Sequence, residues 1–71
     1  MNSQPTSIDS RLERLDKAVA ENEKRIRKLT EKAREYTAKY DYRRLVEALK
    51  DAEKLQHHNS KLIKIIEQTE N

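Results

Sequence analysis

The chain has 71 residues, of which 41% are charged, and its formal net charge is +3. It contains no Cys and no Gly, which excludes disulfide bonds and cysteine-based zinc sites and fits long, highly charged helices. A chain this short buries only about 60% of its unfolded surface, so a lone core is marginal and oligomerisation is the expected support. No stretch is apolar enough for a membrane span or a signal peptide, so we expect a cytoplasmic protein without a membrane partner.

The N-terminal part of the chain carries the clearest pattern. Residues 1–6 are mostly polar and are predicted to form a flexible tail. A helix is predicted over residues 7–39, because apolar residues recur there at alternating steps of three and four, which is a heptad pattern. The positions of this first seam are Ile8, Leu12, Leu15, Val19, Asn22, Ile26, Leu29, Ala33, Tyr36 and Tyr40. Asn22 is the one polar position among them.

The phase of this seam fails after Tyr40, where a second stripe begins. Asp41 lies between the two stripes and is a competent N-cap for a following helix. We therefore predict a turn at residues 40–41 and a second helix over residues 42–69. The alternative is one uninterrupted helix, since no Gly or Pro stands at the turn, and it would be roughly 90 Å long at 1.5 Å per residue. The second stripe consists of Leu45, Ala48, Ala52, Leu55, Asn59, Leu62 and Ile66.

Folding the chain at the predicted turn brings the two stripes into register. Six apolar positions of the first seam, from Leu15 to Tyr36, then face the six apolar positions of the second, and the two polar positions, Asn22 and Asn59, face each other. A buried amide pair of this kind penalises other registers. The sequence therefore predicts an all-α fold, an antiparallel coiled-coil hairpin with Asn22 and Asn59 as the pair that sets its register.

The second predicted helix carries more apolar residues than one seam uses. Tyr42, Leu49 and Ile63 flank the seam, and Val46 and Ile65 lie further out, whereas the matching positions of the first helix are polar. A stripe this wide is typical of a bundle helix. We expect two hairpins to dimerise through this surface into a four-helix bundle, or a helical protein partner to cover it. The predicted function is a non-enzymatic interaction or assembly module.

A second functional hypothesis uses the basic residues of the first helix. Together with the positive net charge, they permit a small nucleic-acid-binding regulator. Acidic residues interrupt the run, however, as is typical of a solvated coiled-coil exterior. Nucleic acid is therefore the alternative partner. The basic residues concerned are Lys24, Arg25, Arg27, Lys28, Lys32 and Arg34.

Three tyrosines, Tyr36, Tyr40 and Tyr42, gather at the predicted turn beside Arg43 and Arg44. The favoured interpretation is a hydrophobic plug that closes the end of the hairpin, because the seam itself accounts for Tyr36 and Tyr40. The alternative is a recognition tip, in which exposed rings and arginines contact a partner or stack on bases.

No chemistry is predicted for this chain. His57 and His58 are adjacent, so on a helix they point about 100° apart and cannot bind one metal ion together. A two-helix hairpin also offers no concave site for paired catalytic groups. We expect no catalytic residue, metal, cofactor or small-molecule substrate.

Overall fold

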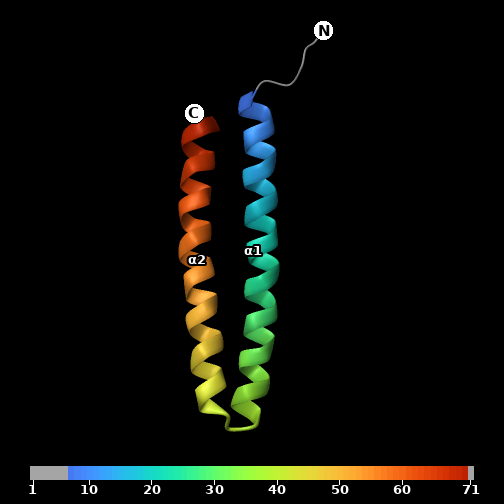
Figure 1. Cartoon of the computed structure of the whole chain (residues 1–71), viewed down its shortest axis with the longest axis vertical. Coiled ribbons are helices and arrows are strands. Elements are labelled where there is room, and N and C mark those ends of the chain that lie inside the picture. The colour runs from blue at the N-terminus through green and yellow to red at the C-terminus, as the bar shows by residue number, and fades with distance from the viewer. Residues whose placement is uncertain (1–6, 71) are drawn as a thin grey trace.

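The computed structural model describes residues 7–70, and their side chains from Ser10 onward. Two helices, α1 (Ser7–Ala38) and α2 (Tyr42–Glu70), lie side by side and antiparallel, so the start of α1 and the end of α2 are neighbours (Figure 1). The predicted all-α hairpin is confirmed, and the single uninterrupted helix is excluded. The tail predicted over residues 1–6 and the side chain of Ile8, the first seam position, lie outside the described residues.

The hairpin is a single layer of two helices, with principal extents of 59 × 20 × 12 Å. Because no other element of residues 7–70 covers either broad face, only the line between the two helices is shielded from water among these residues. Ala33, Ala48 and Asn59 are each 6% exposed and are the only buried side chains between Ser10 and Glu70. The seam is therefore the whole core of the hairpin, and its larger apolar side chains stay half-buried.

α1 ends in a Schellman motif centred on Tyr40. The Tyr40 amide donates to the Thr37 carbonyl over 3.1 Å, and the Asp41 amide donates to the Tyr36 carbonyl over 2.8 Å. This pattern requires a left-handed residue after the helix, usually Gly, and Tyr40 takes that role with φ of 59°. A side chain with a Cβ is disfavoured in this conformation. The chain reverses at the predicted place, without the residue that normally permits it.

α2 begins directly after Asp41, which acts as its N-cap as the sequence predicts. The Arg44 amide donates to Asp41 Oδ1 over 3.4 Å, and the Leu45 amide donates to the Asp41 carbonyl over 3.1 Å. Arg44 Nε also lies 3.6 Å from Asp41 Oδ2, in an ion pair. Asp41 thus takes part in the hydrogen bonds that end α1 and also caps the start of α2, so the connection between the helices is short.

Candidate interaction surface

A pair of asparagine side chains joins the two helices near their middle. Asn22 Nδ2 of α1 donates to Asn59 Oδ1 of α2 over 2.9 Å, and Asn59 Nδ2 donates to the Val19 carbonyl oxygen over 3.2 Å. Asn59 is 6% exposed, while Asn22 is half-buried. The contact predicted between the two amides is present. Its role in penalising other registers stays a prediction.

The amide contact shows which residues of the antiparallel helices lie at the same height. Ala33 and Ala48 are each eleven residues from the contact in the direction of the turn, and both are 6% exposed. Two small side chains at one height let the helices approach closely and exclude water. The same counting places every residue of α1 level with a residue of α2.

An apolar stripe on α2 remains exposed on one side of the seam. Tyr42 is 58% exposed, Val46 is 47%, Leu49 is 52% and Ile63 is 40%. Tyr42, Leu49 and Ile63 share one heptad position, and Val46 lies four residues after Tyr42 and three before Leu49, so these side chains leave the helix on the same side. We call these four residues the α2 stripe.

The α2 stripe and the predicted partner surface share Tyr42, Leu49 and Ile63. The stripe contains Val46, where the predicted surface contains Ile65. Ile65 is half-buried and is not among the exposed large apolar side chains. It lies two residues after Ile63, so it points about 200° away around the helix and cannot share its surface. Ile65 therefore lies on the other flank of the seam from Ile63, and its part in a partner surface stays a prediction. Val46, which the sequence also places outside the seam, is exposed beside Tyr42 and Leu49.

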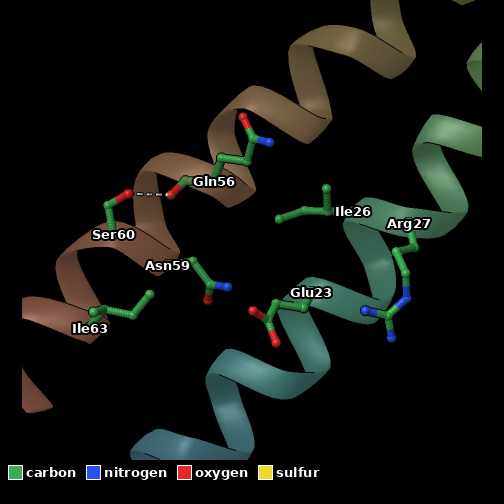
Figure 2. A pocket seen from close by; sticks show the side chains of 7 residues that line it. All are labelled: Glu23, Ile26, Arg27, Gln56, Asn59, Ser60 and Ile63. Atoms are coloured by element: carbon green, nitrogen blue, oxygen red, sulfur yellow. Dashed lines mark hydrogen bonds between the residues drawn. The ribbon is translucent and has the colours of Figure 1, made fainter.

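A shallow groove runs between the helices on the side that carries the α2 stripe. Figure 2 shows Glu23 and Arg27 of α1 across the groove from Ile63 and Gln56 of α2. Ile26, Asn59 and Ser60 complete the lining, with the Ser60 hydroxyl turned back to the Gln56 carbonyl at 3.0 Å. We call this side of the hairpin the groove face. It combines the apolar residues of α2 with acidic and basic residues of α1.

The six basic residues proposed for nucleic acid do not lie together on one face. Arg27 lines the groove and also a neighbouring hollow that contains Arg34. Lys32 instead lines a hollow with Glu47 and Asp51, on the other side of the seam. Lys24 lies in a third hollow with Arg27 and Glu21, which is lined by residues of α1 alone. Lys32 thus lies apart from Lys24, Arg27 and Arg34, and the acidic residues Glu21 and Glu31 lie beside these three.

The tyrosines at the turn do not form the predicted plug. Tyr36 is half-buried, but Tyr40 is 76% exposed and Tyr42 is 58% exposed. The rings of Tyr40 and Tyr42 meet edge to face, with centroids 6.3 Å apart and planes at 69°. Tyr40 leaves the seam because its backbone is left-handed and no longer follows the helix. The last residue of the first seam in α1 is therefore Tyr36.

Other kinds of site were sought over the same residues. Within the part of the chain that the structure describes, no three His, Cys, Asp or Glu side chains cluster in a way that could hold a metal ion. Neither α1 nor α2 has a stretch long and apolar enough to cross a membrane. From Ser10 to Glu70 the one ion pair is that between Arg44 and Asp41. Glu23 and Arg27 in the groove thus have no ionic partner within those residues.

Comparison of the chain with protein-family models, with curated proteins and with solved structures gave no match. The functional argument therefore depends on the groove face and the α2 stripe themselves.

Proposed function

We propose that this chain is a non-enzymatic helical interaction module, which works by packing the α2 stripe against another helix. The observation that carries the proposal is the exposure of Val46, Leu49 and Ile63, at 40–52%, on one side of a hairpin that is a single layer. Isolated apolar side chains on a surface need no explanation, but a run at heptad spacing is how one helix presents itself to another. The proposal includes a cytoplasmic setting, on the strength of the highly charged composition.

The finer form of the proposal is a four-helix bundle made by two hairpins. Full burial of a Val, Leu or Ile side chain contributes about 1.5–3 kcal/mol, and about half of each stripe residue is still in water. Covering Val46, Leu49 and Ile63 in both copies therefore contributes about 4.5–9 kcal/mol. Association costs at least about 4 kcal/mol, so the net gain reaches about 5 kcal/mol and supports a weak, reversible dimer with a dissociation constant of about 0.2 mM or higher. A helix of another protein is the alternative occupant.

The dependence of thermal stability on protein concentration tests the proposal. A protein that associates in its folded state melts at a higher temperature when it is more concentrated. We expect this behaviour from the wild type, followed by circular dichroism, and its loss in the double variant Leu49→Glu/Ile63→Glu. The matched control, Lys54→Gln/Lys61→Gln, changes the net charge equally at exposed positions on the far side of α2.

Each outcome of this experiment has a definite meaning. A control variant that melts like the wild type assigns the effect to the α2 stripe. A wild type whose melting temperature is the same at every concentration, while its helix content stays full, refutes self-association. If the melting temperatures of both variants depend on concentration as that of the wild type does, the α2 stripe is not the interface.

A further inference from the structure

We propose that the partner of the groove face is a second copy of this chain, packed antiparallel about a two-fold axis at the height of Gln56. This inference rests on the proposed function, because it names the occupant and the register of the same surface. A two-fold interface must be self-complementary, so that each residue on one side of the axis meets its counterpart on the other. The sequence and the helix positions satisfy this requirement on both helices, about one common centre.

The apolar residues of α2 are placed symmetrically about Gln56. Gln56 lies fourteen residues from either end of α2, and seven residues from both Leu49 and Ile63. An antiparallel copy centred on Gln56 therefore overlaps α2 completely and sets Leu49 level with the partner subunit's Ile63. A slip of one heptad would set Leu49 against the partner subunit's Gln56 or Glu70 instead. The apolar contacts of α2 thus favour this centre over its nearest alternatives.

The height of α1 relative to α2 is fixed by the contact of Asn22 with Asn59. Gln56 lies three residues from Asn59 toward the turn, and three residues from Asn22 in the same direction stands Arg25. The two-fold axis that passes Gln56 must therefore pass α1 at Arg25. The level of the axis on α1 follows from the apolar residues of α2 and from the Asn22–Asn59 contact alone. The order of charges along α1 is therefore independent evidence for the same axis.

The charges of α1 are complementary about that position. Glu23 and Arg27 stand two residues on either side of Arg25, and Asp16 and Arg34 stand nine residues on either side. Glu23 and Arg27 line the groove (Figure 2). Arg34 lines the hollow beside it, together with Arg27. Asp16 is one heptad before Glu23 and leaves α1 on the same side.

The two-fold axis consequently sets acid against base along α1. Glu23 is level with the partner subunit's Arg27, and Asp16 is level with the partner subunit's Arg34. Repetition by symmetry gives four such pairs in the dimer. The helix of an unrelated protein would have no reason to match both the apolar spacing of α2 and the charge order of α1 about one centre, which is why we assign the surface to a second copy.

Cysteine cross-linking tests the register directly, since the natural chain contains no Cys. Gln56→Cys lies near the axis and should form a disulfide-linked dimer under mild oxidation. Leu49→Cys alone should not, because the two copies of residue 49 would be fourteen residues, or about 21 Å, apart, whereas a disulfide requires Cα atoms within about 7 Å. A mixture of Leu49→Cys chains with Ile63→Cys chains should cross-link. Lys54→Cys, on the far side of α2, is the unlinked control.

Charge reversal tests the contribution of α1. Glu23→Arg should raise the dissociation constant of the dimer about five- to thirty-fold, because two attractive pairs become repulsive. The swapped variant Glu23→Arg/Arg27→Glu should recover most of the loss. Glu21→Arg makes the same change of charge two residues away, on the far side of α1, and should leave the dissociation constant unchanged.

The outcomes separate this inference from the proposed function. A wild type that never dimerises overturns this inference and the bundle of two hairpins, and leaves a helix of another protein as the occupant of the α2 stripe. A wild-type dimer in which Gln56→Cys does not cross-link, or in which Leu49→Cys links to itself, overturns the register and leaves self-association standing. Equal effects of Glu23→Arg and Glu21→Arg overturn the ionic pairing along α1. Circular dichroism of each variant establishes that it is still helical.

Discussion

Replacing both seam asparagines with leucine should make the hairpin more stable and less specific. Asn22→Leu/Asn59→Leu removes two hydrogen bonds, of 2.9 and 3.2 Å, each of which contributes about 1 kcal/mol. In their place, one leucine is buried at a site that is 6% exposed and one is half-buried, which together contribute about 2–4 kcal/mol. The net expectation is a free energy of unfolding higher by about 0–2 kcal/mol.

The cost of this substitution should appear in the number of structures formed. In the double variant the helices can shift along each other and still place an apolar residue against an apolar residue. In the wild type the same shift would place an asparagine against a leucine. We expect the double variant to show several sets of backbone amide resonances, or a mixture of assembly sizes, where the wild type shows one.

The single variant Asn22→Leu is the control for the hydrogen-bond argument. It leaves the Asn59 Oδ1 atom buried without its donor, so it should lower the free energy of unfolding by about 1–3 kcal/mol before any gain from the leucine is counted. The reasoning is refuted if the double variant unfolds more easily than Asn22→Leu, or if it keeps a single register as strictly as the wild type.

Three further substitutions test the turn and the alternative function. Tyr40→Gly should raise the free energy of unfolding by about 0.5–1 kcal/mol in urea denaturation, because Gly relieves the left-handed backbone; a loss instead would mean that the contact of Tyr40 with Tyr42 outweighs the strain. Truncating the N-cap, Asp41→Ala, should lower it by about 1 kcal/mol, and an unchanged midpoint would exclude the cap as a determinant of the turn. In a gel-shift titration we expect no salt-sensitive, micromolar binding of duplex or single-stranded nucleic acid; such binding, abolished by Lys28→Glu/Lys32→Glu, would favour the nucleic-acid regulator.

The hairpin itself could be predicted from the sequence because its determinants are periodic and local. Two heptad stripes that are out of phase with each other define two helices. The single polar residue in each stripe indicates how the two helices align. Asp41 identifies the turn, since a side chain that caps a helix is recognisable from its type and position. Each of these signals acts within one or two turns of helix, so no knowledge of the tertiary structure is needed to read it.

For two residues, backbone geometry rather than sequence spacing decides which side chains surround them. Tyr40 continues the heptad spacing in the sequence, but its positive φ takes it out of the helix and into solvent. Ile65 is apolar and close to Ile63 in sequence, yet two residues of α-helix turn it to another side. The height at which Gln56 meets α1 also needed the structure, because it depends on the observed contact of Asn22 with Asn59.

The mass of the wild-type chain in solution decides whether two hairpins associate. Sedimentation equilibrium over a series of concentrations up to about 5 mM reaches the weak affinity expected from the exposed stripe. We expect a reversible equilibrium in which the mean mass rises from the 8.5 kDa of one chain toward twice that value. A single species of 8.5 kDa throughout this range, with full helix content by circular dichroism, would contradict self-association.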